Sequence, residues 1–443
     1  MKNLLLIFIF FLIAHNGIAT AYYFSSKGDD RNDGKSVAAA WKSLEKISKV
    51  QHLFRAGDSL LFECGSVFKG QINVATSGLY LGAYGFGAKP VISGSLEILE
   101  WVEHDRNIWK AECLNCTEPA NLFMKNIAQT VGRYPNTGYL TISATSTVET
   151  SITDASMLFK DGYWNGAEMV VRSGRWTIDN LPVKAYNHKT FTTSLTSSYP
   201  LQPGKGYFLQ KHLATLDQPG EWFYQASTKQ IYLYLKSGVN PKNEKIRVSV
   251  LDFGLTITNE QNVIIENLTF AHQQLAGVIV KGSKNISLQR IDILNSGKNG
   301  LEIINCENPC VENSFITNAN NNGVEWHNNT GGTFSYNAIS CTGIYPGRGA
   351  SGDGTYIALR ITSDTPAQGS NSFEHNTIDS TGYSGIDFRT GNTIIKNNNI
   401  SNFCLIKDDG GGIYTWENTF GNTIIESNTI SNGVGSGEGT INP

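Results

Sequence analysis

The stretch Gly277-Val278-Ile279-Val280 returns twice downstream, as Gly300-Leu301-Glu302-Ile303 and as Gly323-Val324-Glu325-Trp326. Each copy begins 23 residues after the one before. Two further sets of apolar residues keep the same step: Ile265, Leu288 and Val311, and Phe270, Ile293 and Ile316. A fixed period of this length indicates a stacked repeat, because so short a unit buries its apolar face only against its neighbours.

The repeated segments are short, rich in β-branched residues and separated by Asn and Gly corners, and none has the apolar spacing of a helix. Three longer coils follow, with matching segments at Gly354-Thr355-Tyr356-Ile357, Gly385-Ile386-Asp387-Phe388 and Gly412-Ile413-Tyr414-Thr415. We therefore predict an all-β protein whose residues 251–443 form a right-handed parallel β-helix. Six asparagines support this fold, because a stacked Asn hydrogen-bonds the next coil and tolerates left-handed backbone geometry. They are Asn267, Asn313, Asn337, Asn376, Asn398 and Asn428.

Residues 1–21 are predicted to be a cleaved signal peptide. Lys2 supplies a positive charge, Leu4 to Ile13 is an unbroken apolar run, and Ala19-Thr20-Ala21 fits the cleavage pattern. The alternative is an uncleaved membrane anchor, but the run is only about half of the ~20 residues that a spanning helix needs. We therefore expect a secreted protein, extracellular, periplasmic or at the cell surface, with no membrane contact after cleavage.

Two further regions precede the repeats. Residues 22–96 are expected to form an N-terminal cap and the first coils, with a capping helix over Ala38 to Phe54 and strands at 59–63, 71–74 and 78–83. Residues 97–250 lose the period and gain aromatic residues, which predicts an inserted β-rich domain with an aromatic core. The glycine-rich stretch from Gly433 to Pro443 follows a well-formed strand without a cap, so we expect the sequence to be truncated there.

Composition excludes some partners and leaves the cysteines open. The net charge is -3 and only 16% of residues are charged, so nucleic acid is not an expected partner. Of seven cysteines, Cys113 and Cys116 form a CxxC that fits half of a zinc site, a redox pair or a local bridge. Cys306 and Cys310 fit either core thiols or a bridge. We expect a monomer without a metal or other cofactor.

Several short motifs resemble a known family. Gly28-Asp29-Asp30-Arg31-Asn32-Asp33-Gly34 and Gly82-Ala83-Tyr84-Gly85 resemble the N-terminal ends of secreted bacterial β-helix proteins of the pectin-lyase-like superfamily. Gly220-Glu221-Trp222-Phe223-Tyr224 and the stretch from Asp408 to Trp416 look like elements of its glycoside hydrolases, the β-xylosidase-like and α-fucosidase-like enzymes. This resemblance implies a parallel β-helix and a carbohydrate substrate.

The strand period also predicts which side chains leave the core. The apolar residue after each repeat glycine should point inward, so the next residue faces outward. That outward column reads Ile279, Glu302, Glu325, Tyr356, Asp387 and Tyr414. A second outward column, two residues later, reads Lys281, Ile304, His327, Ala358, Arg389 and Trp416.

This face has the chemistry of a glycosidase. Coils stack about 4.8 Å apart, which places Glu325 and Asp387 about 10 Å apart at the backbone, and leaning side chains reach the ~5 to 9.5 Å that glycosidases use. We predict Asp387 as the nucleophile or base, kept ionised by Arg389, and Glu325 as the acid, with Asp409 in reserve for either role. The predicted substrate-binding residues are Arg389, His327, Tyr356, Tyr414, Trp416, Asp408 and Glu302.

The leading hypothesis is a glycoside hydrolase that cleaves a plant or algal polysaccharide or oligosaccharide. Carboxylates on an exposed sheet also serve solubility, which is the simpler interpretation of Glu302 alone. A polysaccharide lyase would use Arg389, His327 or Ca²⁺ to neutralise a uronate carboxylate. Ca²⁺ takes about six to eight oxygen ligands, and the sequence does not supply enough of them. A non-catalytic carbohydrate-binding or adhesin β-helix would keep the aromatic face without needing the carboxylates.

Overall fold

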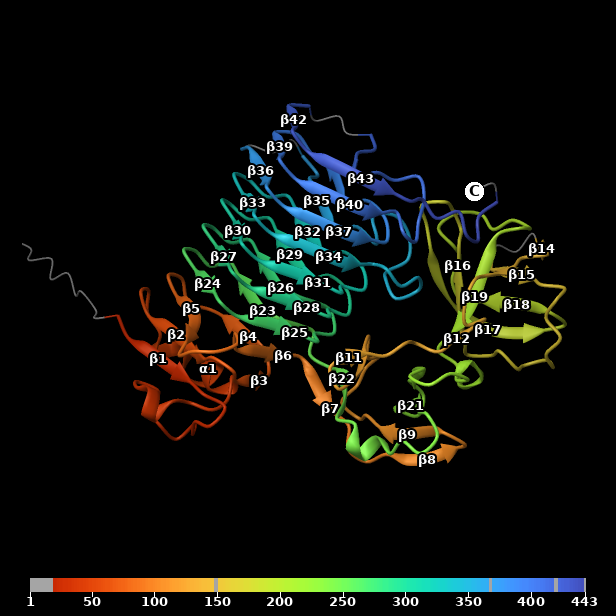
Figure 1. The fold of residues 1–443 in the computed structure, drawn as a ribbon, viewed down its shortest axis with the longest axis horizontal. Helices are drawn as coiled ribbons and strands as arrows, with labels where there is room; N and C mark the ends of the chain where they lie inside the picture. Colours follow the sequence, from red (N-terminus) through yellow and green to blue (C-terminus); the bar gives the residue numbers. More distant parts are fainter. Residues whose placement is uncertain (1–18, 147–149, 366–368, 418–420, 442–443) are drawn as a thin grey trace, which may run out of the picture.

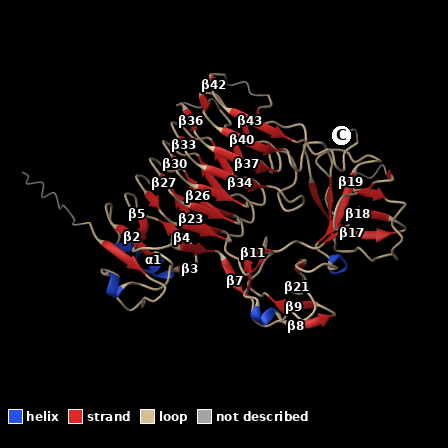
Figure 2. Ribbon diagram, viewed as in Figure 1, coloured by secondary structure: helices blue, strands red, loops and turns tan. Residues whose placement is uncertain are grey.

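The computed structural model describes residues 19–146, 150–365, 369–417 and 421–441, and most of the predicted signal peptide lies outside them. Three long parallel sheets dominate the fold and stack coil upon coil along one axis (Figure 1). Each full coil contributes one strand to each of these sheets, which are numbered 1, 2 and 3 in the order in which the chain passes through them. Strands make up almost all of the regular structure (Figure 2).

The strands of the three sheets run through both the N-terminal coils and the repeats. Sheet 1 holds β1 (Ala21–Phe24), β2 (Ser59–Glu63), β5 (Tyr80–Tyr84), β24 (Ile264–Glu266), β27 (Ser287–Gln289), β30 (Cys310–Glu312), β33 (Thr333–Ser335), β36 (Asn371–Glu374), β39 (Thr393–Lys396) and β42 (Thr423–Glu426). Sheet 2 holds β3 (Val67–Lys69), β6 (Val91–Ser93), β25 (Thr269–Ala271), β28 (Asp292–Leu294), β31 (Phe315–Thr317), β34 (Ala338–Thr342), β37 (Thr377–Thr381), β40 (Asn399–Phe403) and β43 (Thr429–Gly433). Sheet 3 holds β4 (Ile72–Val74), β23 (Phe253–Thr258), β26 (Ala276–Lys281), β29 (Leu301–Ile304), β32 (Val324–His327), β35 (Leu359–Thr362), β38 (Ile386–Arg389) and β41 (Ile413–Tyr414).

The 23-residue step is the register of these sheets. Val278 pairs with Leu301 and Leu301 with Val324, while Ile265 pairs with Leu288. The predicted inward residues of sheet 3 have no exposed surface as far as Ile386 and line one continuous core, which confirms the predicted facing. Ile413, in the last strand of the sheet, packs against the same core but is only partly buried.

The predicted strand at 354–357 is wrong. Residues 343–358 form a loop, and the strand of that coil is β35, so that Leu359 pairs with Val324 and Arg360 with Glu325. Tyr356 has a φ of 69° and no exposed surface, and it packs against Val170 and Phe208 of the insertion. A positive φ is incompatible with a strand. The segment Gly354-Thr355-Tyr356-Ile357 therefore resembles a repeat strand in sequence but does not form one.

The corner asparagines are of two kinds. Asn267 and Asn313 have positive φ and occupy the left-handed turn itself. The other four are stacked one above another with their side chains directed inward, each accepting a hydrogen bond from the backbone N–H of the coil before it. Ser314, Asn337, Asn376 and Asn398 donate these bonds, each at 2.9 Å. These four asparagines, the asparagine ladder, thus hold the turn in the same position on successive coils.

The N-terminal cap is present with a shorter helix than predicted. Only α1 (Glu45–Val50) is α-helical, between the 3-10 turns η1 (Val37–Ala39) and η2 (Gln51–Leu53). The predicted apolar stripe nevertheless covers the first coil, since Trp41, Leu44, Ile47 and Phe54 are all buried in the main core. Trp41 also forms a parallel bridge with Phe24, which extends sheet 1 instead of the helix.

The insertion leaves the β-helix after β6 and returns before β23, at the corner between sheets 2 and 3 (Figure 1). Its proximal part holds two four-stranded sheets made of β7 (Ser95–Glu97), β8 (Val102–Asp105), β9 (Ile108–Glu112), β10 (Leu122–Met124), β11 (Ile127–Ala128), β20 (Trp222–Gln225), β21 (Gln230–Tyr234) and β22 (Ile246–Ser249). Its distal part is one larger sheet made of β12 (Arg133–Tyr134), β13 (Leu140–Thr141), β14 (Ala144–Thr145), β15 (Ser151–Thr153), β16 (Glu168–Val171), β17 (Asp179–Asn187), β18 (Thr190–Thr193) and β19 (Gly206–Gln210). Two 3-10 turns, η3 (Leu213–Thr215) and η4 (Pro241–Asn243), complete it.

Two features link the insertion and the repeats. Cys113 and Cys116 form a disulfide, which selects the local bridge among the alternatives, whereas Cys306 and Cys310 are free thiols. The glycine-rich stretch after β43 crosses to the distal sheet, where the N–H of Gly206 donates to the Gly439 carbonyl at 2.8 Å. Arg172, buried in the distal sheet, donates to the Ser436 carbonyl at 3.0 Å.

We expect Asn337→Ala to lower the free energy of unfolding by about 3 kcal/mol, because it leaves the Ser314 N–H and the Val311 carbonyl unpaired inside the helix. Asn399→Ala is the matched control, since Asn399 is an exposed asparagine on β40 of sheet 2 and surface changes cost less than about 0.5 kcal/mol. Chemical denaturation followed by circular dichroism measures both variants. Equal losses would show that the ladder adds nothing to stability.

Candidate active site

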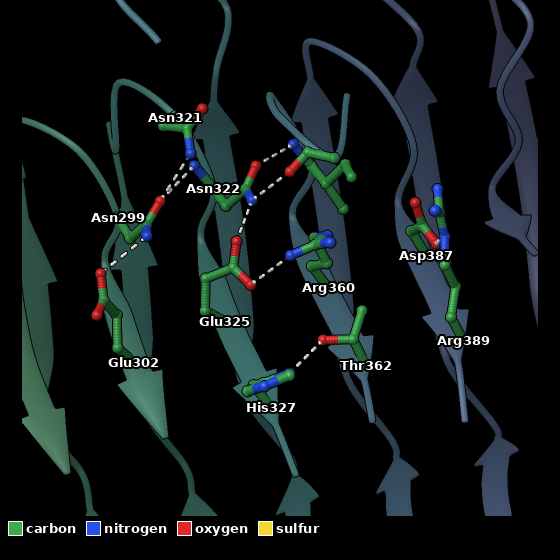
Figure 3. A network of polar contacts seen from close by, with 12 residues as sticks. Asn299, Glu302, Asn321, Asn322, Glu325, His327, Arg360, Thr362, Asp387 and Arg389 are labelled. Carbon is green, nitrogen blue, oxygen red and sulfur yellow. Dashed lines mark hydrogen bonds and ion pairs between the residues drawn. The ribbon is translucent and has the colours of Figure 1, made fainter. Parts of the chain in front are cut away.

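One row of side chains crosses the outer face of sheet 3 near its corner with sheet 2. Ile279, Glu302, Glu325, Arg360, Asp387 and Tyr414 are direct neighbours on successive strands. Figure 3 shows its central members side by side on neighbouring strands. The predicted column is therefore present, with Arg360 in the place that the sequence analysis assigned to Tyr356. The second column has Thr362 in the place assigned to Ala358.

Glu325 is held from two sides. Arg360 Nη1 lies 3.2 Å from its Oε2, and the Asn322 side chain donates to its Oε1. Asn322 is itself fixed, because its Oδ1 accepts the Ile357 N–H at 2.8 Å and its amide donates to the Gly354 carbonyl at 2.9 Å. Burial raises the pKa of the Glu325 carboxyl, and Arg360 and Asn322 oppose that rise.

Asp387 lies in a different environment from the exposed position predicted for it. The residue has no exposed surface, and neither carboxyl oxygen has a hydrogen-bond partner among the described residues. Arg389 Nε lies 3.5 Å from Oδ1, too far for a good hydrogen bond. Burial raises the pKa of this carboxyl, and the charges of Arg389 and Arg360 offset part of the rise. Both oxygens of this carboxyl therefore remain able to accept a hydrogen bond from a group that reaches them.

The flanking polar residues extend the site along the sheet. Glu302 accepts a hydrogen bond from the Asn299 side chain at 2.9 Å. His327 Nδ1 lies 2.9 Å from Thr362 Oγ1, and its Nε2 lies 3.4 Å from the Asp364 carboxylate. His327 and Arg389 stand in the second outward column and remain partly exposed, as predicted.

The aromatic residues predicted to stack on sugars divide into three cases. Tyr356 is wrong as a sugar platform, because it is buried beneath the insertion. Tyr414 is the neighbour of Asp387 on β41 and is half-buried, with its ring 6.2 Å from that of Tyr383. Trp416 lies just beyond β41 and is 58% exposed. Two of the three predicted aromatics thus remain on the accessible side of the site.

Asp408 and Asp409 do not share one role. Asp408 accepts two hydrogen bonds from Arg175 of the insertion, at 3.1 Å and 2.5 Å, which lower the pKa of its carboxyl against the effect of burial. This pair links the insertion to the last coils. Asp409 is exposed, and its carbonyl accepts the Tyr383 hydroxyl at 2.9 Å, on the side of the site where Tyr414 lies.

The sequence analysis missed Arg360, Asn322 and Tyr383. Arg360 had a usable signal, since Ala358-Leu359-Arg360-Ile361-Thr362 alternates as a strand does. Asn322 precedes a repeat glycine, as Asn299 does, and both bond the carboxylate three residues later. Tyr383 gave no sequence signal, because it belongs to a turn. Within the described ranges no group of three His, Cys, Asp or Glu residues is arranged to hold a metal ion.

Comparisons with known proteins agree with this architecture. Residues 253–430 match the family model described as "Right handed beta helix region". This part of the chain is a right-handed parallel β-helix. In the residues that the structure describes, no helix has the length and apolar character to span a bilayer.

The chain as a whole resembles carbohydrate-active proteins in sequence and in fold. It is 23% identical over 365 residues to a lacto-N-biosidase of Bifidobacterium longum subsp. longum, a match that covers 74% of this chain but only 21% of that relative's length. A solved structure named "Glycoside hydrolase" has a TM-score of 0.71 at 13% identity, over 94% of this chain and 96% of that one. XylC in complex with xylose has a TM-score of 0.52 at 12% identity, over 92% of this chain and 65% of that one.

We expect Asp387→Asn to raise the melting temperature of the β-helix by a few degrees at pH 7.5. Burial raises the folded-state pKa of Asp387 above its unfolded value of about 4, so its ionisation disfavours the folded state increasingly as pH rises above that value. A neutral amide removes this cost, and the gain should shrink towards pH 4. Scanning calorimetry across this range, with the exposed Asp252→Asn as control, measures the effect. A gain that is largest at pH 4 would contradict it.

Proposed function

We propose that this protein is a glycoside hydrolase whose active site is the row on sheet 3. The observation that carries the proposal is a pair of carboxyls on the outer face of a sheet, one mostly buried on Glu325 and one fully buried on Asp387, with Arg360 between them. Two rungs separate their backbones by about 10 Å, and carboxyl separations of about 5 to 9.5 Å flank a glycosidic bond in such enzymes. Solubility explains exposed carboxylates and does not explain buried ones.

The environments of the two carboxyls suggest different roles. Hydrogen bonds to a carboxylate favour its ionised form, and Glu325 accepts from Arg360 and Asn322. Asp387 accepts none from the described residues, so its proton is the easier one to keep. We therefore propose Asp387 as the general acid and Glu325 as the base or nucleophile, the reverse of the assignment that the sequence suggested. Asp409 stays the reserve for the acid, since it approaches the site from the next coil.

The surrounding residues fit a sugar ligand. Tyr414 and Trp416 offer partly exposed rings on which a pyranose stacks, and His327, Arg389 and Glu302 offer hydrogen-bonding groups along the same face. The similarity to a lacto-N-biosidase and to XylC supports a glycan as substrate without selecting one. We propose that the protein is exported through residues 1–21 and meets a plant, algal or host glycan outside the cell.

We expect Asp387→Asn and Glu325→Gln each to lower turnover by at least about 100-fold, because acid-base groups contribute about 10²–10⁴-fold. Reducing-end release is measured first on a panel of plant and algal polysaccharides, xylo-oligosaccharides and oligosaccharides that carry a lacto-N-biosyl group. The variants are then compared on the substrate found, with melting temperatures recorded alongside.

Glu312→Gln is the matched control, because Glu312 lies on β30 in sheet 1, away from the row. It should retain full turnover. Full activity in both Asp387→Asn and Glu325→Gln would remove the row as the active site. Release of an unsaturated, ultraviolet-absorbing product would instead assign the site to a polysaccharide lyase. Glycan binding without any cleavage across the panel would indicate a carbohydrate-binding β-helix.

A further inference from the structure

Three cavities meet at one arginine where the insertion joins the β-helix. Arg348 lies in the loop 343–358 and lines a cavity of about 330 Å³, a second of about 320 Å³ and a third of about 210 Å³. The first is large enough for a small ligand, since such sites span about 300–1,000 Å³. It opens between the insertion, the loop 343–358 and the turns that precede β26 and β29.

The charge of Arg348 has no acidic partner. Its Nη2 donates to the Asn121 side chain and lies 3.4 Å from the Ala120 carbonyl, while its Nε has no hydrogen-bond partner among the described residues. None of the ion pairs found between described residues includes it. Burial lowers the pKa of Arg348 to about 10, which leaves it charged at neutral pH. Arg348 is partly exposed and its guanidinium lies over the Tyr345 ring, 5.4 Å from the ring centroid. No carboxylate of the described residues pairs with it, so an anion in the cavity would be a favourable partner for this charge.

The walls of the 330 Å³ cavity add to this positive character. Lys298 lies on the rim, exposed and without an ion-pair partner among the described residues. Lys211 also lines the cavity, where Glu118 at 2.9 Å and Glu168 at 3.1 Å already balance its charge. Together Lys211, Lys298 and Arg348 supply three positive charges against the two carboxylates of Glu118 and Glu168, an excess of one positive charge in a chain whose net charge is -3. Trp222, Phe223 and Tyr224 of β20 also line the cavity, and of these three only Tyr224 is partly exposed.

The cavity is connected to the row on sheet 3. The N–H of Ala350, which lines the cavity, donates to the Asn321 side chain at 3.1 Å, and Asn321 donates to Asn299 at 2.9 Å. Asn299 in turn holds Glu302. A ligand group in the cavity would thus lie against the same turns that position the carboxylates.

We propose that this cavity binds the anionic group of an acidic sugar, a carboxylate or a sulfate ester, with Arg348 and Lys298 as its charged partners. The planar guanidinium presents paired donors to such oxyanions, and the partly exposed Tyr224 in the lining offers a ring to the apolar face of a sugar. The choice of a sugar as ligand rests on the proposed hydrolase function, whereas the anion preference rests on the cavity alone.

Calorimetric titration of the full chain at low salt tests this site. The probes are D-glucuronate, D-galacturonate, galactose 6-sulfate, D-galactose and inorganic sulfate. We expect a charged sugar to bind, D-galactose to bind at least about tenfold more weakly, and added salt to weaken the charged ligand. Uronates that bind alone would identify a carboxylate site, and the sulfated sugar alone a sulfate site. Equal binding of D-galactose, or sulfate binding as tightly as the sugars, would overturn the proposal.

Arg348→Gln should weaken the charged sugar at least about tenfold, since hydrogen bonds between charged groups are the strong ones. Arg106→Gln, which removes an exposed arginine of the insertion, should leave binding unchanged. If Arg348→Gln fails to fold, Lys298→Gln on the rim should still weaken binding several-fold. Full affinity in a folded Arg348→Gln variant, or in Lys298→Gln where it alone folds, would refute the site. Unchanged affinity in Asp387→Asn, a substitution in the row and outside the lining of the cavity, separates this result from the proposed hydrolysis.

Discussion

Everything in this protein depends on the parallel pairing of one coil with the next. Each coil exposes an apolar face too small to fold alone, so the free energy of the core comes from stacking. The strand period fixes the consequence, because a residue that faces outward on one coil has its counterpart directly above it on the next. The buried asparagine ladder of Asn337, Asn376, Asn398 and Asn428 keeps the turns in the same register. A site built on such a sheet inherits a fixed spacing that no loop has to maintain.

The row on sheet 3 uses this spacing to hold charges that would otherwise be unfavourable. Glu325, Arg360 and Asp387 follow one another across three strands, with Arg389 beside the last of them. Burying a lone carboxylate is costly, and each arginine offsets part of that cost. The compensation is incomplete at Asp387, whose oxygens have no donor among the described residues. A structural ion pair would not leave such a deficit, whereas the general acid proposed here needs it in order to keep its proton.

The sequence predicted the parts of this arrangement that the period controls. Val278, Leu301 and Val324 face the core because the 23-residue step repeats without a break, and Glu302 and Glu325 face outward for the same reason. The prediction failed at Tyr356. The loop 343–358 lengthens this coil, so that Leu359 lies 35 residues after its partner Val324, and a segment that begins with a glycine resembles a strand within the loop. The repeat period gives no information on the path of that loop.

Burial of the site could not be predicted from the strand pattern either, because the side chains around Asp387 include Tyr383 of a turn and Arg360, whose strand the sequence analysis did not predict. Asp387 occupies an outward position and is nonetheless inaccessible. Pattern arguments state which face a side chain takes, and only the tertiary structure states what lies on that face. The same limit applies to Arg348. Its lack of a carboxylate partner depends on which residues line the three cavities, and no sequence motif indicates it.

The segments that enclose the site share one place on the fold. The insertion, the loop 343–358 and the segment 404–412 all leave the coils at the corner between sheets 2 and 3, where the strands that carry Glu325 and Asp387 begin. Gly354 shows how closely they approach, since a Cβ there would lie 2.8 Å from Arg360 Nε, at a backbone φ of 68° that favours glycine. Segments inserted at this corner therefore change the residues around the site, while the stacked strands that carry the row stay the same. A β-helix can carry an additional pocket in this way without a change in the register of the row on sheet 3, and the cavity beside the insertion is an example.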